Sequence, residues 1–110
     1  MRIHLIKEKT IRNYVLKHAG SHIPFTEWLS KLKKADWDTP LDILDTFCSA
    51  DLLGKGYSRA VFDIGGNNYR LIGQYAFGET EAHLFVCWIG THAEYDKLCK
   101  DNKQYSVNVY

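Results

Sequence analysis

The order of hydrophobic and polar positions predicts a strand followed by a helix at the start of the chain. Ile3 and Leu5 alternate with polar neighbours, which is typical of a short strand with one buried face. From residue 8 to residue 19, apolar side chains recur at four-residue spacing and predict a narrow helical stripe. Gly20 follows this stripe, and glycine is common just past the C-terminus of a helix.

Two more helices are predicted in the first half of the chain. The second helix begins near Pro24, because proline is favoured in a first helical turn. Its apolar stripe consists of Phe25, Trp28, Leu29, Leu32 and Ala35. A short third helix begins within residues 39–42, where Thr39 is the expected cap and Pro40 suits the first helical position.

The second half is rich in β-branched and aromatic residues, which predicts strands over residues 59–64, 68–77 and 83–89. Gly65-Gly66-Asn67 joins the first two strands as a tight hairpin, because these residues tolerate positive φ. Thr91 and Glu94 then have the spacing of a capping box and open a short helix through about residue 100. The order β-α-α-α-β-β-β-α predicts an α+β fold.

Side chains alternate along a strand, so the predicted hairpin has two distinct faces. The face expected to pack on the second helix carries Phe62, Ile64, Tyr69, Leu71 and Tyr75. The opposite face carries Arg59, Val61, Asp63, Arg70, Ile72 and Gln74. A loop at Gly66-Asn67 sets Asp63 opposite Arg70, whereas a loop at Gly65-Gly66 sets Val61 there. The sequence leaves both registers open.

In either register Arg59 and Arg70 lie on the same face, where two guanidinium groups can receive a phosphate. The plainer interpretation, which the pattern alone favours, is a cross-strand ion pair between Arg70 and Asp63 worth about 0.2–1 kcal/mol. Lysines offer further positive charge. The second helix carries Lys31, Lys33 and Lys34. The first interpretation is that they form its solvated side, and the alternative is that they bind phosphate. Lys55, between two glycines, is either a cation near the arginine face or part of a surface loop.

His92 is the clearest candidate for chemistry. It occupies the first position of the capped helix, where exposed backbone N–H groups favour an anion, and histidine is suited to proton transfer near neutrality. Tyr95 and Asp96 follow on the same turn and bring a hydroxyl and a carboxylate close to it. The alternative is an ordinary surface histidine. The other histidines, His4, His18, His22 and His83, have no ligand-type spacing, so no metal site is expected.

Composition narrows the remaining choices. A chain of 110 residues with 45% hydrophobic and 25% charged residues is expected to form one domain over residues 1–110. No apolar run is long enough for a membrane span, and no export signal opens the chain, so a cytoplasmic protein is expected. Its three cysteines form no C-x-x-C pair, which favours reduced thiols. The net charge of +1 argues mildly against a dedicated nucleic-acid binder.

Taken together and in order, four segments resemble the HigB-type toxins of bacterial toxin–antitoxin systems, which are mRNA interferases of the RelE-like superfamily. These are residues 33–37 (KKADW), 47–51 (FCSAD), 61–72 (VFDIGGNNYRLI) and 90–97 (GTHAEYDK). The resemblance extends to about residue 98, and the tail over residues 101–110 lies beyond it. The alternating end of this tail is compatible with an edge strand or with a partner contact.

The resemblance implies a RelE-like fold: a twisted, mainly antiparallel sheet of about four strands, N-terminal helices on one face and a short C-terminal helix. It implies cleavage of mRNA, often on the ribosome, without metal or cofactor, and silencing by a HigA-type helix-turn-helix antitoxin. Arg70, His92 and Tyr95 match positions of the family's motifs and are the expected catalytic residues. Lys55 and Arg59, in a loosely aligned basic stretch, are expected RNA contacts together with Lys33 and Lys34.

Two other classes of function remain as alternatives. The first is a non-catalytic module that only pairs with its antitoxin in a DNA-binding repressor complex. The second, an enzyme acting on small molecules, has little support because the chain carries no cofactor fingerprint. The presence of Arg70 and His92 together favours catalysis, since a degenerate copy would be expected to lose one of them.

Overall fold

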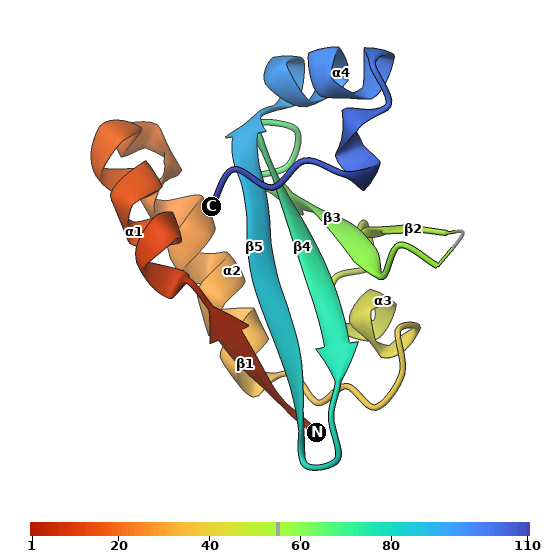
Figure 1. The fold of residues 1–110 in the computed structure, drawn as a ribbon. Coiled ribbons are helices and arrows are strands. Elements are labelled where there is room, and N and C mark those ends of the chain that lie inside the picture. Colours follow the sequence, from red (N-terminus) through yellow and green to blue (C-terminus); the bar gives the residue numbers. More distant parts are fainter. Residues whose placement is uncertain (55) are drawn as a thin grey trace.

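A computed structural model describes residues 1–54 and 56–110. Within these ranges, five strands form one mixed sheet in the order β1-β5-β4-β3-β2. The strands are β1 (Arg2–Ile6), β2 (Asp51–Leu53), β3 (Arg59–Ile64), β4 (Tyr69–Phe77) and β5 (Glu81–Thr91). The helices are α1 (Glu8–Lys17), α2 (His22–Lys34), α3 (Asp42–Thr46) and α4 (His92–Lys100), with short 3₁₀ turns at Ala19–Ser21 and Lys103–Tyr105. The fold is therefore α+β, as predicted (Figure 1).

The sheet has one strand more than expected. β2 is only three residues long and pairs antiparallel with β3, so it is too short for an alternating pattern to reveal it. The first strand, β1, runs parallel to β5, and the other neighbouring strands are antiparallel. This pairing makes β1 an edge strand that is held to the sheet through β5 alone.

The β3–β4 hairpin adopts the register that sets Asp63 opposite Arg70. Ile64 pairs with Tyr69, so the turn contains the four residues between them. Gly65 and Gly66 have φ of +66° and +65°, a left-handed backbone that disfavours other side chains at these positions. The predicted hairpin with glycines at positive φ is therefore confirmed, but its loop is longer than the two residues expected.

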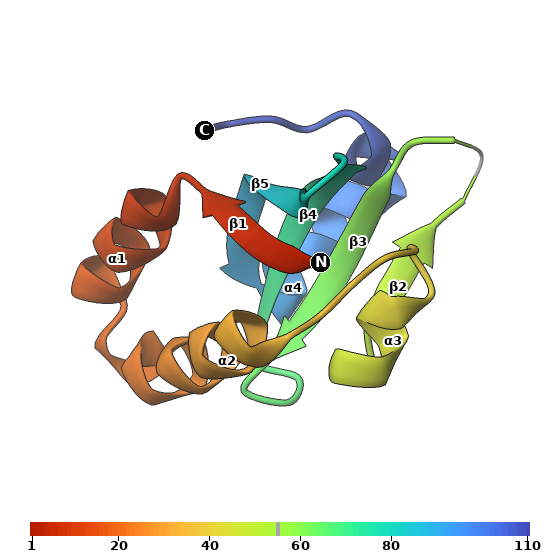
Figure 2. The ribbon, with the colours of Figure 1, turned by 90° about the horizontal axis from the view of Figure 1, so that it is seen from below.

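The two faces of the sheet are covered by different parts of the chain. Figure 2 shows α1, α2 and α3 on one side and the C-terminal segment on the other. Trp28 and Leu32 of α2 pack with Phe62, Ile64 and Leu71 in the main core, as predicted. A smaller second core contains Leu53, Val61, Ile72 and Cys87 under Trp88, Tyr95, Leu98, Tyr105 and Val107. The face expected to be open is thus partly closed by α4 and the residues that follow it.

A bulge in β5 determines which of the two cores its side chains enter. The β4–β5 register steps from Ile72 opposite Trp88 to Gly73 opposite Val86, which leaves Cys87 as the extra residue. Val86 therefore lies in the main core, whereas Cys87 lies in the second core and Trp88 packs against it. Because of the bulge, the consecutive residues Cys87 and Trp88 both face the second core and Ile89 returns to the main core, which regular alternation along β5 would not allow.

Helix ends differ in detail from the sequence prediction. α1 ends at Lys17, and Gly20 lies in the following 3₁₀ turn instead of closing the helix. α2 begins at His22, with Pro24 inside its first turn. The predicted cap Thr39 is wrong, because α3 begins at Asp42.

Asp42 supplies the contacts at the start of α3. Its carboxylate accepts the backbone N–H groups of Asp38 and Thr39 at 2.7 and 2.9 Å. These hydrogen bonds lower the pKa of Asp42 below its ordinary value. The side chain that stabilises this turn is therefore an acidic residue at the helix start, and the threonine contributes its backbone.

The C-terminal tail forms no strand. It crosses the second face of the sheet, and the Val109 N–H donates to the Cys87 carbonyl at 3.0 Å. Across the described ranges, every helix is too short or too polar to span a bilayer.

Candidate active site

His92 lies where β5 ends and α4 begins, beside the β3–β4 turn. Thr91 caps the helix: its hydroxyl accepts the Glu94 N–H at 3.2 Å, while the Glu94 carboxylate accepts the Thr91 N–H at 2.8 Å. The predicted capping box is confirmed. The His92 N–H donates to the Asn68 carbonyl at 3.1 Å, which ties the start of α4 to the hairpin turn. Backbone contacts on both sides therefore determine where the imidazole is placed.

The His92 side chain is 48% exposed, and its Nε2 lies 3.4 Å from Oδ2 of Asp96, one helical turn further on. The two groups form an ion pair only when the imidazole carries a proton. An accessible imidazole next to a carboxylate can accept a proton from a substrate hydroxyl and return one to a leaving group. This arrangement is suited to acid–base chemistry.

The start of α4 is less favourable for binding an anion than the sequence predicted. Among the first backbone N–H groups, that of His92 is bonded to Asn68 and that of Glu94 to Thr91. The Glu94 carboxylate also lies at this end of the helix. Two donors are occupied and a negative charge is already present, so a phosphate must compete for this position.

Arg70 is buried within the hairpin. Its Nε lies 2.9 Å from Oδ1 of Asp63 in an ion pair, with the two side chains 8% and 28% exposed. Its Nη1 donates to the Tyr69 carbonyl at 3.0 Å and to the Gly66 carbonyl at 3.4 Å. Among the residues that the structure describes, Nη2 donates to one acceptor, Oδ1 of Asn67, at 3.5 Å. Arg70 therefore forms the ion pair with Asp63 that the plainer interpretation predicted. Its guanidinium also stabilises the turn through the hydrogen bonds to the turn carbonyls.

Tyr95 belongs to the second core. It packs against Trp88, with ring centroids 6.1 Å apart, and its pKa is raised by burial and by the neighbouring Cys99. The phenol therefore stays protonated near neutrality. In this geometry Tyr95 can donate a hydrogen bond, but it is poorly suited to accept a proton.

The basic residues expected to bind RNA are spread over the molecule. Arg59 is 6% exposed and lies beneath the tail, where its Nη1 donates to the carbonyls of Gln104 and Val107 at 3.2 and 2.7 Å. Lys55 lies outside the described residues. Lys33 and Lys34 are exposed in the last turn of α2, about 15 Å along the helix from the first turn, which is the part next to the hairpin. The structure brings Arg70, His92 and Tyr95 to one end of the sheet and leaves Lys33 and Lys34 at the other.

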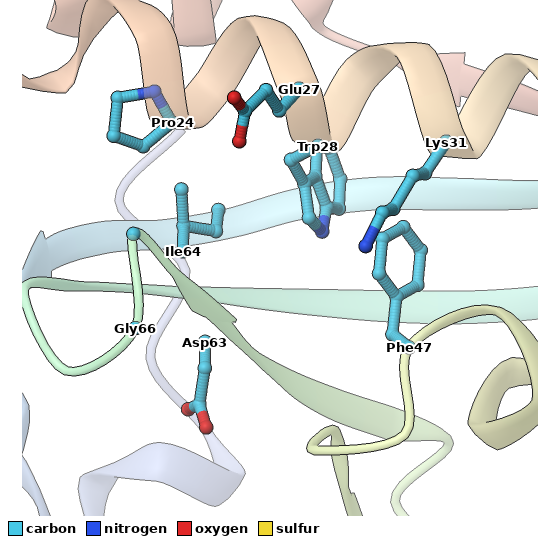
Figure 3. A pocket seen from close by; sticks show the side chains of 9 residues that line it. Pro24, Glu27, Trp28, Lys31, Phe47, Asp63, Ile64 and Gly66 are labelled. Carbon is cyan, nitrogen blue, oxygen red and sulfur yellow. The ribbon is translucent and has the colours of Figure 1, made fainter.

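A cavity of about 220 Å³ lies between α2 and the β3–β4 turn (Figure 3). Trp28 and Lys31 line it from the helix, and Phe47 closes it from the α3 side. Asp63 and Gly66 form the hairpin wall. Lys31 is thus the helix lysine nearest the hairpin, although the cavity opens on the α2 side of the sheet, away from α4.

A second hollow, of about 370 Å³, was missed in the sequence. It lies between α4 and the segment after it, and Trp88, Lys97 and Lys103 are among its lining residues. Trp88 is half-buried, and its indole lies directly over Gly90, where an added Cβ would approach it to 2.4 Å. An aromatic ring and two lysines are suited to an RNA base with its phosphates, although the carboxylates of Glu94 and Asp101 line the same hollow and offset the lysine charge. No local pattern in the sequence indicated this hollow, because the contribution of Trp88 depends on the bulge in β5.

Two histidines that are far apart in the sequence become neighbours in the sheet. β1 pairs with β5 so that His4 lies opposite His83, and Glu81 lies beside both. The spacing of the histidines along the chain contained no sign of this cluster. Spacing along one segment does not report pairing between strands.

Comparison with known proteins links the hairpin and α4 to one family. A family model described as the HigB toxin, the RelE-like toxic component of a toxin–antitoxin system, matches residues 21–98. The chain is also 29% identical over 105 residues to a protein of Escherichia coli O6:H1 (strain CFT073) named mRNA interferase HigB, covering 93% of this chain and 100% of that protein. The family match includes the β3–β4 hairpin, β5 and the His92 turn, and it ends before the tail.

Proposed function

The chain belongs to the HigB toxin family, the RelE-like toxic component of a toxin–antitoxin system, and we propose that it is an endoribonuclease that cleaves mRNA. The name of the Escherichia coli relative, mRNA interferase HigB, supports this activity. The family description also implies an antitoxin that binds the toxin. We further propose that the antitoxin is of the HigA helix-turn-helix type, that the fold is RelE-like and that the toxin acts on ribosome-bound messages in the cytoplasm.

The observation that carries the proposal is the position of His92. It is the exposed imidazole within the family segment at residues 90–97, and backbone hydrogen bonds to the β3–β4 turn hold it in place. In the proposed reaction, the RNA 2′-oxygen attacks the neighbouring phosphorus. The bond from phosphorus to the 5′-oxygen breaks, which leaves a 2′,3′-cyclic phosphate. His92 takes the 2′-hydroxyl proton or protonates the departing 5′-oxygen, and the reaction needs no metal.

We assign Arg70 a positioning role first. Its Nε and Nη1 are occupied by Asp63 and by carbonyls of the turn, and the same turn provides the Asn68 carbonyl that binds the His92 N–H. Nη2, with one contact at 3.5 Å, is the donor that remains for a phosphate oxygen. Arg70 therefore supports the site by keeping the turn in shape, and it contributes one donor to charge stabilisation.

The RNA is proposed to cross the hollow next to α4. Trp88 offers a ring for base stacking, and Lys97 and Lys103 offer positive charge to the RNA backbone, which the neighbouring Glu94 and Asp101 partly offset. Arg59, Lys33 and Lys34 then affect binding less than these residues do. The reason is that Arg59 is covered by the tail, while the two lysines lie at the far end of α2.

A non-catalytic module is the second candidate. Three observations favour it: the engaged guanidinium of Arg70, the occupied donors at the start of α4 and the half-buried Tyr95. Such a chain would bind its antitoxin without cutting RNA. The two candidates differ in one measurable outcome, namely new RNA ends.

The test is primer extension on cellular mRNA after brief induction of the native chain, His92→Ala and the control His22→Ala. His22 is an exposed histidine at the start of α2, so its loss tests for a general effect of removing an imidazole. We expect new 5′ ends within translated regions for the native chain and the control, and their loss, by about 10²-fold or more, in His92→Ala. Unchanged ends in His92→Ala would refute the assignment of His92. RNA without new ends in all three samples, from soluble and folded proteins, would favour the binding module.

A further inference from the structure

We propose that His4, Glu81 and His83 form a binding site for a divalent transition-metal ion of the zinc class. The site bridges β1 and β5 at the end of the sheet opposite His92. It lies about 30 Å from that residue, since nine positions of β5 and the start of α4 separate them. The site is independent of the proposed cleavage chemistry.

The donor set is the first argument. Two imidazoles and one carboxylate are typical ligands of zinc, and with three protein ligands a fourth position stays open to water. All three ligand atoms lie within 4.8 Å of one another. Magnesium and calcium prefer all-oxygen sites, so two histidines select against them.

The distances are close to those that a bound ion requires. Oε1 of Glu81 lies 3.6 Å from Nδ1 of His4 and 3.8 Å from Nε2 of His83. Ligand bonds of about 2.0–2.1 Å in a tetrahedron place neighbouring ligand atoms roughly 3.3–3.4 Å apart. The ligand nitrogens of His4 and His83 lie within 4.8 Å of each other, so binding requires side-chain rotations that bring the three donor atoms closer together.

The sheet preorganises these ligands. His4 and His83 are direct partners in the parallel register, and Glu81 lies two residues before His83 on the same face of β5. The Nδ1 atom of His83 is buried and has no hydrogen-bond partner among the residues that the structure describes. The ring therefore presents its other nitrogen, Nε2, toward Glu81.

The surroundings are open enough for an ion and one or more waters. His4, Glu81 and His83 have side chains 56%, 45% and 31% exposed. Arg2 lies opposite Glu81 in the register and is exposed on the His4 side of β1, so its charge weakens cation binding. A bound ion would join an edge strand to its only neighbour in the sheet, and its consequence is greater stability of the N-terminal strand.

The experiment uses the full chain, free of any histidine tag and stripped of metal, titrated with ZnCl₂ in a non-chelating buffer. Calorimetry is expected to detect one zinc per chain, and the melting temperature is expected to rise with zinc and not with magnesium. Co²⁺ is expected to give the visible absorption of a four-coordinate ion. His4→Gln and His83→Gln should each weaken binding by more than about tenfold, whereas the control His22→Gln should bind as the native chain does.

Zinc binding that survives both His4→Gln and His83→Gln would overturn the proposal, as would the absence of saturable one-to-one binding to the native chain. If His83→Gln does not fold, His4→Gln decides alone, because His4 is the more exposed of the two. Arg2→Gln tests the electrostatic effect of Arg2. This variant should bind zinc more tightly than the native chain, because a positive charge near the site is removed, and weaker binding would contradict the arrangement. RNA cleavage is expected to be unchanged in His4→Gln, which separates this site from that of His92.

Discussion

Removing the carboxylate of Asp63 tests the arrangement of the hairpin most directly. Asp63→Ala leaves the Arg70 guanidinium 8% exposed and without its charged partner, which lies 2.9 Å away in the native chain. Breaking a fully buried ion pair by removing one member costs about 3–5 kcal/mol. A hydrogen bond to a charged group contributes about 1.5–3 kcal/mol. Because Asp63 is 28% exposed and water can replace part of it, we expect the lower range, about 1.5–3 kcal/mol.

The assay is equilibrium unfolding in urea, applied to the native chain, Asp63→Ala, Arg70→Met and the double variant. Arg70→Met leaves Asp63 able to reach solvent, so its cost is expected to be smaller, about 1–2 kcal/mol. The double variant should lose less than the sum of the two single variants, with a coupling energy of at least about 0.5 kcal/mol.

Three results would refute this reasoning. A cost of less than about 0.5 kcal/mol for Asp63→Ala would place it among ordinary surface substitutions. Additive single variants would mean that the two side chains do not stabilise each other. If Arg70→Met retained full stability and lost cleavage, the arginine would contact the phosphate and would not support the turn.

Two further predictions concern other parts of the fold. Gly90→Ala should shift the tryptophan fluorescence and cost about 1–3 kcal/mol in urea unfolding, because a Cβ there would lie 2.4 Å from the Trp88 ring; an unchanged spectrum and stability would contradict the close contact. Asp42 has a pKa lowered by the backbone N–H groups that it accepts, so its stabilising effect is present above the pKa of the unfolded chain and is lost as pH falls through the lowered folded value. Asp42→Asn should therefore be less stable than the native chain at neutral pH, and the difference should shrink on acidification; a constant difference would show that the charge is not responsible.

Features encoded by neighbouring residues could be predicted from the sequence. The β3–β4 hairpin and the capping box of α4 follow from positive φ at glycines and from the Thr91–Glu94 spacing. The face of the hairpin that packs on α2 follows from alternation, and Phe62 and Leu71 lie in the main core as expected. The position of His92 at the first residue of α4 was likewise predictable, because a capping box specifies where a helix begins.

Other features depend on which distant segments pair, and no local pattern reports that. Arg59 belongs to the arginine face by parity, yet the tail covers it and takes its donors. Tyr95 follows His92 on the same turn, yet it is half-buried and packs against Trp88 on the strand. His4 and His83 meet only because β1 joins the sheet beside β5. The sequence by itself determined the elements and their apolar faces, since those are set by short-range backbone and burial preferences. Only the tertiary structure decided which polar groups remain free, because strand pairing and the path of the tail depend on how the whole chain buries its surface.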